Sequence, residues 1–461
     1  MKARKPLHKD RFKTITEETI ITLSIFRWVF LAVIVGIAVG SVTSLFLYCL
    51  EYSELFIQSF SFYYFLLPFV LFFCILIIKS ISPDSEGHGT EKVIRAVHQH
   101  HGFIRFRVIP IKLFTTILTI AFGGSVGKEG PCAQIGAALS SSFSRLFKFS
   151  KQDQKKLVIC GISAGFASVF GTPIAGAIFG VEVLFMGNLL YSVLLPSLIA
   201  GMVSYQTSLL LGTSYSYHFI QFDKIVDPSF FIMVIFAGLF FGLVSVLTID
   251  LLKYAEKCNK SLKLWPPLKG FIGGLLIILI ALAFSTDYLG LGLHVIESSL
   301  SGTQIVWYAF LIKILVTILT LAFGGSGGVL TPLFFIGSTA GICFAQLFGL
   351  DLSAFAAFGL ISVLAGAANT PIAACVLSIE LFGTQITPYA TVACVISFFM
   401  TGYRSIFPSQ VLSAQKTEGI ILKPGEEVEH YQTNYEYKTR KLMVSGKHIA
   451  QKILKIKKPL P

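Results

Sequence analysis

The chain has 461 residues, of which 54% are hydrophobic and only 13% are charged, and its formal net charge is +13. This composition excludes an ordinary soluble domain and is typical of a polytopic helical membrane protein. A basic balance can indicate a nucleic-acid partner, but positive tails and loops kept on the cytoplasmic side of a membrane explain it more simply, so no nucleic acid is expected.

The first predicted elements are a basic tail and two membrane spans. Residues 1–18 form the tail, which is expected in the cytoplasm. Residues 20–50 and 55–81 are apolar and long enough to span a bilayer. A polar break follows at residues 82–103. It contains Gly87-His88-Gly89 and the histidines 98, 100 and 101, which are expected to be solvated rather than to bind a metal.

The next apolar segments are short for a full span, given a rise of about 1.5 Å per helical residue. They are residues 104–121, 132–147, 157–170 and 173–185. Broken helices are tolerated in a membrane only where their backbone is buried in protein or lines a cavity. Thr172-Pro173 and Thr370-Pro371 each resemble an N-cap followed by proline at the first helical position, so each predicts a helix that restarts within the bilayer.

The remaining elements complete one membrane domain over residues 19–410. Full spans are predicted at residues 188–211 and 230–252, and the basic loops 147–156 and 253–269 are expected in the cytoplasm. A second basic cytoplasmic tail is predicted at residues 411–461.

Two blocks of sequence recur within this domain. Ile111–Ser125 matches Ile312–Ser326 at an offset of 201, and Thr172–Ala175 matches Thr370–Ala373 at an offset of 198. At that second offset, Glu182 also matches Glu380. The blocks indicate a duplicated unit, with one repeat over about residues 20–211 and the other over about 228–407. Paired interruptions in two such halves point to the binding site of a transporter.

The glycine-rich stretch Gly127-Lys128-Glu129-Gly130-Pro131 carries the strongest chemical signal. An ionisable pair between apolar segments is expensive in lipid and therefore marks an ion or substrate pathway. The glycines allow backbone N–H groups to approach a ligand, and Pro131 suits the first turn of a helix whose positive end would face an anion. Glu129 is predicted to occupy the anion site itself and to act as a gate. Lys128 either adds positive potential or is held in an ion pair.

The matching stretch in the second repeat is Gly328-Val329-Leu330-Thr331-Pro332. It offers backbone N–H groups and no charge, which suits a weakly held anion, because conduction requires binding weak enough to allow release.

These motifs resemble those of the CLC family of chloride channels and chloride/proton antiporters over roughly residues 20–410. Gly127–Pro131 matches the family signature, and Gly328–Pro332 resembles a second motif in which Leu330 replaces a phenylalanine. The resemblance implies an all-α membrane fold with two inverted repeats and about 16–18 helical segments, many of them broken or re-entrant. It also implies a homodimer in the cell membrane with both termini in the cytoplasm. Chloride is the expected transported ion, and no other cofactor is expected.

The resemblance also implies roles for individual residues. Glu129 corresponds to the gating glutamate, and the amides of Val329 and Leu330 correspond to anion ligands. In a third motif, His88 stands where the family has a serine, and Phe407 stands where a tyrosine hydroxyl is usual. Val183 occupies the position of the internal proton-transfer glutamate in the best-known antiporters. The full predicted anion site is Gly87, His88, Gly89, Gly127, Lys128, Gly130, Val329, Leu330 and Phe407, with Glu129 as gate and proton carrier.

Three functions follow as alternatives. Because Val183 and Phe407 cannot transfer a proton, passive channel-like chloride conduction is favoured, with chloride/proton antiport as the alternative. From a different class, Gly324–Gly327 resembles the serine motif of an intramembrane hydrolase. That reaction needs a histidine in the membrane, and the only later histidines are His430 and His448, in the polar tail. No catalytic residue is therefore predicted, and the protein is not expected to be an enzyme.

Overall fold

The computed structural model describes residues 7–220, 228–417, 420–421, 425–429 and 434–435, with side chains from Thr16 onward. Within this part of the chain there are 16 α-helices and only four two-residue strands. The predicted all-α polytopic fold is confirmed.

The first half of the chain contains nine helices. They are α1 (Leu7–Gln58), α2 (Leu67–Ile81), α3 (Gly89–Gln99), α4 (Val108–Ala121), α5 (Glu129–Leu146), α6 (Lys151–Phe170), α7 (Pro173–Glu182), α8 (Tyr191–Leu210) and α9 (Pro228–Ser261). The second half adds α10 (Pro266–Ala283), α11 (Leu293–Leu300), α12 (Ala309–Ala322), α13 (Leu330–Phe348), α14 (Leu352–Ala368), α15 (Pro371–Phe382) and α16 (Thr387–Met400). Short 3-10 turns lie at Tyr63–Leu66, Pro83–Ser85 and Thr286–Tyr288.

The strands tie the end of the chain to its middle. Strand β1 (Phe185–Met186) pairs in parallel with β2 (Val411–Leu412), and β3 (Ile420–Ile421) pairs antiparallel with β4 (Asn434–Tyr435). Part of the predicted polar tail is therefore folded back onto the segment that follows α7.

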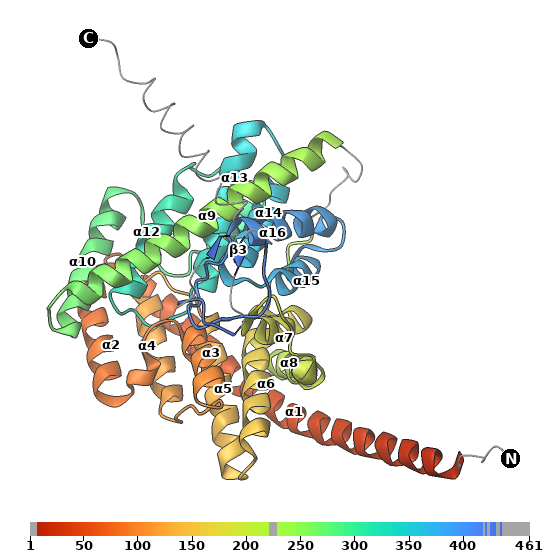
Figure 1. Cartoon of the computed structure of the whole chain (residues 1–461). Coiled ribbons are helices and arrows are strands. Elements are labelled where there is room, and N and C mark those ends of the chain that lie inside the picture. The colour runs from red at the N-terminus through yellow and green to blue at the C-terminus, as the bar shows by residue number, and fades with distance from the viewer. Residues whose placement is uncertain (1–6, 221–227, 418–419, 422–424, 430–433, 436–461) are drawn as a thin grey trace.

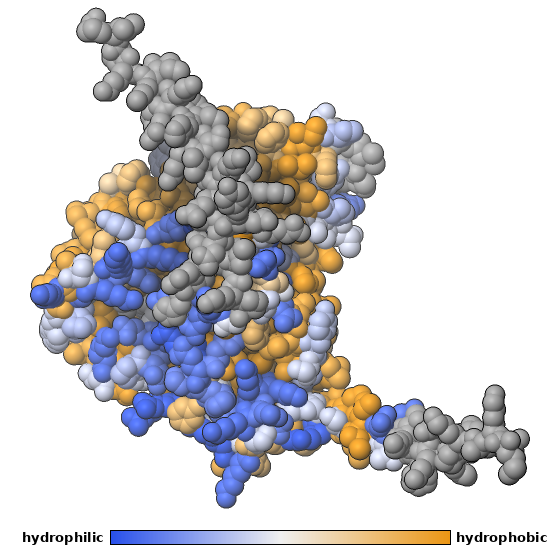
Figure 2. Space-filling view, in the orientation of Figure 1, coloured by the Kyte–Doolittle hydropathy of each residue, from blue (hydrophilic) through white to orange (hydrophobic). Residues whose placement is uncertain are grey.

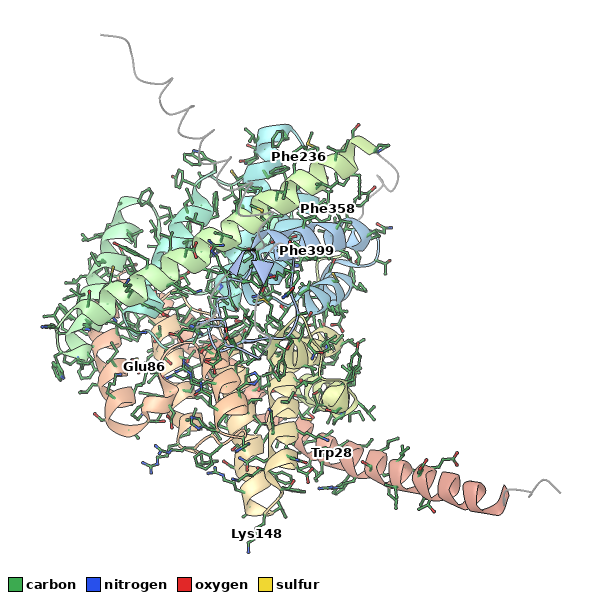
Figure 3. All side chains as sticks on the ribbon, in the orientation of Figure 1. Trp28, Glu86, Lys148, Phe236, Phe358 and Phe399 are labelled. Atoms are coloured by element: carbon green, nitrogen blue, oxygen red, sulfur yellow. The ribbon has the colours of Figure 1, made fainter. Side chains whose placement is uncertain are left out.

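Six helices in the described residues are long and apolar enough to cross a membrane by length and composition: α1, the Tyr63–Ile81 segment, α8, α9, α10 and α13. Six further apolar helices are shorter, with 10–17 residues: α4, α7, α12, α14, α15 and α16. The mixture of full and short helices agrees with the expectation of broken spans. Hydrophilic residues gather on one face of the molecule, with hydrophobic residues around its rim (Figure 2). Lys148 points outward from the loop between α5 and α6 (Figure 3).

Several predicted boundaries were wrong. Helix α1 continues from Leu7 to Gln58 and takes in much of the predicted N-terminal tail, because no proline interrupts this stretch. Its N-terminal part extends away from the rest of the molecule (Figure 1). The second span begins at Leu67 rather than at residue 55. Pro68 favours this start because proline suits the first turn of a helix.

Two predicted loops also contain helix. The polar break at 82–103 holds α3, which buries an apolar face formed by Val93, Ile94 and Val97. Helix α9 continues to Ser261, well into the loop predicted at 253–269. Its charged last turns remain helical because they continue a helix whose apolar part is already stabilised by packing.

The two repeats form equivalent helix pairs. Helix α5 packs on α6, and α13 packs on α14, in each case through glycines. A Cβ added at Gly136 would lie 2.3 Å from the Gly161 carbonyl oxygen, and one added at Gly337 would lie 2.4 Å from that of Gly359. Small residues are therefore required where the backbones of these helices meet.

The repeats also cap each other. The Glu182 carboxylate at the end of α7 accepts hydrogen bonds from the backbone N–H groups of Ile372 (3.0 Å) and Ala373 (2.7 Å) in α15. Glu380 in α15 accepts from Ile174 (3.1 Å) and Ala175 (2.7 Å) in α7. A carboxylate thus satisfies the free donors at each helix N-terminus.

Thr172 and Thr370 do occupy the N-cap positions predicted for them, and each helix does begin at the following proline. Neither hydroxyl caps its helix, however, and both are buried with no hydrogen-bond partner in the described part of the chain. The glutamates of the opposite repeat take the place that a threonine side chain would fill.

Candidate functional site

Two glycine loops from the two repeats meet in the interior. The Gly127 N–H donates to the Gly328 carbonyl oxygen (2.7 Å), and the Gly328 N–H donates to that of Gly127 (2.5 Å). A Cβ added at Gly130 would lie 2.9 Å from the Gly328 Cα, so the backbones touch. The stretches singled out in the sequence therefore form one structure.

Two helices begin at this meeting point. Glu129 is the first residue of α5, and Leu330 is the first residue of α13. The first N–H groups of a helix have no partner within it, and its N-terminus carries partial positive charge. Val329 and Leu330, the predicted anion ligands, are 3% and 1% exposed, so their amides lie in a dry environment.

Glu129 already fills the N-terminus of α13. Its Oε2 accepts from the Thr331 backbone N–H (3.2 Å), and its Oε1 accepts from the Thr331 hydroxyl. The Glu129 side chain is only 2% exposed. The carboxylate thus occupies donors that would otherwise be open to an anion. Thr331 belongs to the second glycine motif, but no local signal in the sequence indicates that it pairs with Glu129, because the two positions are 202 residues apart.

The Gly87-His88-Gly89 motif lies against these loops. The His88 backbone forms a parallel bridge with Gly327, and a Cβ added at Gly89 would lie 2.4 Å from the Gly130 carbonyl oxygen. Gly87 has a φ of +73°, a conformation that favours glycine. The buried Lys112 ammonium donates to the Gly87 carbonyl oxygen and holds this turn in place.

Phe407 reaches the same place from the far end of the chain. Its ring centroid lies 5.9 Å from that of His88, and the residue is fully buried. Two residues later, Ser409 donates to Glu91 in the first turn of α3 through its hydroxyl and its backbone N–H (3.2 Å). The Glu91–Ser409 contact, which the sequence did not predict, fixes Phe407 relative to His88.

Val183, at the position of the internal proton-transfer acid, has no exposed surface. Its carbonyl oxygen accepts from the Gln410 side-chain amide (2.9 Å), which also donates to the Ala368 carbonyl oxygen (2.8 Å). This position therefore holds a buried alkyl group and a satisfied backbone.

A cavity borders the motif loops on each side. The first, which we term the basic vestibule, has a volume of about 600 Å³ and includes Gly87 and His88 in its wall. Its charged wall residues are Lys79, Glu86, Glu91, Lys92, Arg95, Glu256, Lys260, Lys269 and Glu429.

The second cavity, the acidic vestibule, has a volume of about 460 Å³ and includes Glu129 and Thr331. Its other charged wall residues are Glu51, Glu54, Glu297 and Lys128. Lys128 forms no ion pair within the described residues, which favours its role as a source of positive potential over a paired one.

The two vestibules have no wall residue in common. Gly87 and His88 line the basic vestibule, whereas Lys128 and Glu129 line the acidic one. Because the loops that carry these residues contact each other, they separate the two cavities.

Ser326, the candidate nucleophile of the hydrolase alternative, is buried in a network of hydroxyl groups. Its Oγ lies 2.9 Å from that of Thr115, which donates to it, and 3.3 Å from that of Thr116. Within the described residues no histidine hydrogen-bonds to it, and His430 and His448 lie outside them. Ser326 therefore contributes to packing between the repeats.

Duplicated membrane helices whose N-termini meet between two separate cavities are typical of a polytopic membrane transport protein. Residues 70–402 match the family model described as voltage gated chloride channel. A chloride/fluoride channel protein of Pseudomonas syringae pv. tomato is 34% identical over 399 residues, covering 85% of this chain and 88% of that protein. The chain belongs to the voltage-gated chloride channel, or CLC, family.

Solved structures agree with this assignment. A CLC-type fluoride/proton antiporter superposes with a TM-score of 0.81 at 30% identity, covering 85% of this chain and 99% of the other. A slow cyanobacterial Cl⁻/H⁺ antiporter, at 20% identity, shares the fold with a TM-score of 0.71 over 81% of this chain and 94% of the other. The protein is thus an integral membrane protein of a family that transports anions.

Proposed function

We propose that this protein exchanges a small halide, fluoride or chloride, for protons, with Glu129 as both gate and proton carrier. The observation that carries the proposal is the Glu129 carboxylate seated on the N-terminus of α13. A relative named as a chloride/fluoride channel protein and a similar structure described as a fluoride/proton antiporter support it.

Competition for one set of donors explains how the exchange would work. The ionised carboxylate holds the Thr331 N–H and hydroxyl and excludes an anion. Protonation removes its charge and weakens these hydrogen bonds, so the side chain can leave. The amides of Val329 and Leu330, the Thr331 hydroxyl and the glycine loops at Gly127 and Gly130 would then bind the halide. A fluoride ion, being small and a strong acceptor, would gain most from such donors.

Passive conduction is the second candidate, and the sequence favoured it. Val183 and Phe407, buried and without titratable groups, support it. The similarity to two antiporters weighs the other way. Serine hydrolysis is not proposed, because the partners of Ser326 in the described ranges are the hydroxyl groups of Thr115, Thr116 and Thr119.

We also propose the orientation and assembly. The basic vestibule and both termini would face the cytoplasm, because Lys-rich loops are retained there. Two copies would pair through the exposed apolar side chains of α7, α8, α15 and α16. These include Ile174, Leu195, Ile372, Ile379 and Phe399, which are 43–52% exposed.

The test is simultaneous recording of anion and proton flux in liposomes. Vesicles receive an outward gradient of fluoride or chloride, and valinomycin with potassium holds the voltage at zero. Uphill proton movement that is lost in Glu129→Gln supports antiport. Anion flux without proton movement would instead establish passive conduction.

A further inference from the structure

An antiporter must exchange protons with both vestibules, and Glu129 borders only the acidic one. In the position where an internal acid would begin the route from the other side, this chain has the buried Val183. Another titratable group would therefore have to connect the basic vestibule to the glycine loops.

His88 combines the required properties. The residue lines the basic vestibule, yet it is only 7% exposed. Its Nδ1 is buried and has no hydrogen-bond partner among the residues that the structure describes. Buried polar atoms are nearly always paired, so a ring nitrogen that no protein group satisfies is available to bind a proton, water or an anion.

Its position in the backbone connects it to the anion site. His88 pairs with Gly327, the residue before the Gly328 that joins the Gly127 loop. Most other acids and bases of the basic vestibule lie on helices or in the segment after Phe407, and Glu86, just before the motif, is held in an ion pair with Lys79. Among the groups in that wall, His88 is the one titratable side chain within the motif loops.

We propose that His88 is the inner proton-transfer residue of the exchange, an assignment that rests on the antiport proposed above. One ring nitrogen takes a proton from a hydronium ion in the basic vestibule, which leaves water and forms an imidazolium. The other nitrogen then gives up its proton, which passes through water to the Glu129 carboxylate, leaving the neutral ring in its second tautomer. Imidazole has two such nitrogens, and a tautomer change or ring flip resets it.

The charges around His88 link this step to the anion. Lys112 in α4 bonds the adjacent Gly87 carbonyl oxygen, and Lys92 and Arg95 in α3 share the vestibule wall. Lys79 in α2, Lys269 in α10, and Glu256 and Lys260 in α9 lie in the same wall.

The acids nearest in sequence are already engaged, since Glu86 pairs with Lys79 and Glu91 with Ser409 and Arg95. Glu429 lies 3.9 Å from Arg95. The positive charges of Lys92 and Lys112 oppose a further positive charge on His88. The imidazolium is therefore favoured when an anion lies beside it.

The experiment compares His88→Asn and His88→Gln with wild type in the liposome assay. Asn and Gln retain polar atoms near the positions of the two ring nitrogens but cannot titrate. Because a positioned acid or base contributes about 10²–10⁴-fold to proton transfer, we expect the number of protons moved per anion to fall by about 100-fold. His98→Asn is the matched control, because His98 does not line either vestibule and its ring hydrogen-bonds the Leu184 carbonyl oxygen (2.9 Å) and packs on Phe185.

A second variant distinguishes proton transfer from structure. Val183→Glu in the His88→Asn background should restore proton movement by supplying an acid at the alternative position. An unchanged proton-to-anion ratio in His88→Asn would overturn the assignment while leaving antiport intact. Parallel loss of both fluxes without rescue would assign His88 to anion binding instead. Absence of proton movement in wild type would overturn antiport and this inference together.

Discussion

Thr331 donates two hydrogen bonds to Glu129, one from its hydroxyl to Oε1 and one from its backbone N–H to Oε2 at 3.2 Å. The pair joins the first turns of α5 and α13, so one carboxylate lies at the N-termini of two helices. Any anion that binds the α13 donors must displace this side chain.

Thr331→Val should therefore loosen the gate. The substitution removes the hydroxyl donor but leaves the backbone N–H in place. A hydrogen bond to a charged group contributes about 1.5–3 kcal/mol, so the equilibrium should shift roughly 10–100-fold toward release of Glu129. Anion flux would then become less dependent on acid pH, as measured with ion-selective electrodes between pH 5 and 8. Thr331→Ser retains the hydroxyl and should behave like wild type. Identical pH profiles for Thr331→Val and wild type would contradict this account.

Glu54 and Glu297 should supply protons to Glu129. Both line the acidic vestibule with it, and a cavity with a net negative wall concentrates cations. Glu54→Gln combined with Glu297→Gln should slow proton entry from this side by roughly tenfold, since focused fields alter association rates by 10–10³. Proton uptake is measured with a pH dye under a chloride gradient. Glu17→Gln, on an exposed part of α1, is the control. Equal proton rates in the double variant and wild type would show that these acids do not collect protons.

Glu182→Ala and Glu380→Ala should each destabilise the fold. Either change removes two charge-assisted hydrogen bonds to a helix N-terminus and leaves N–H groups unpaired, which costs about 1–3 kcal/mol where such a group is buried, as at Ala373. The loss should be larger for Glu182, which is 5% exposed, than for the partly exposed Glu380. Thermal unfolding in detergent measures both, with Glu17→Ala as the control. An unfolding temperature that did not change in Glu182→Ala would rule out a stabilising cap.

Lys416 should make stability depend on alkaline pH. Its ammonium donates to the Asn369 side chain (2.7 Å) and the Phe398 carbonyl oxygen (2.6 Å), and it lies 3.5 Å from the centroid of the Phe398 ring. Burial lowers the pKa of Lys416 well below its ordinary value. Between that lowered pKa and the ordinary value of about 10.4, the unfolded chain binds more protons than the folded one. The free energy of unfolding therefore rises with pH in this window.

Lys416→Met should flatten that rise, because methionine carries no proton in either state. Unfolding temperatures at pH 7 and pH 10 should differ less for the variant than for wild type. Lys416→Arg keeps a group that stays charged across the window, so it should also lose the rise while retaining hydrogen-bond donors. An identical pH response in wild type and Lys416→Met would refute the linkage.

Local signals in the sequence were sufficient to predict the class of protein and much of its architecture. Long apolar runs, the matching Ile111–Ser125 and Ile312–Ser326 blocks and the proline restarts at Pro173 and Pro371 indicated a duplicated helical membrane protein. The predicted helix ends were less accurate, because a helix such as α9 continues past its apolar part into polar residues that hydropathy does not assign to it.

The position of Glu129 at a helix N-terminus follows from the sequence alone, because the glycine-rich loop, the flanking apolar segments and Pro131 act over a few residues. The distant contacts follow from tertiary packing: Thr331 binds the Glu129 carboxylate, His88 lies beside Gly327, and Glu182 caps the start of α15. These contacts join segments about 190–240 residues apart. Their pairing follows from how two repeats close around each other, a property of the folded chain that no local pattern of residues contains.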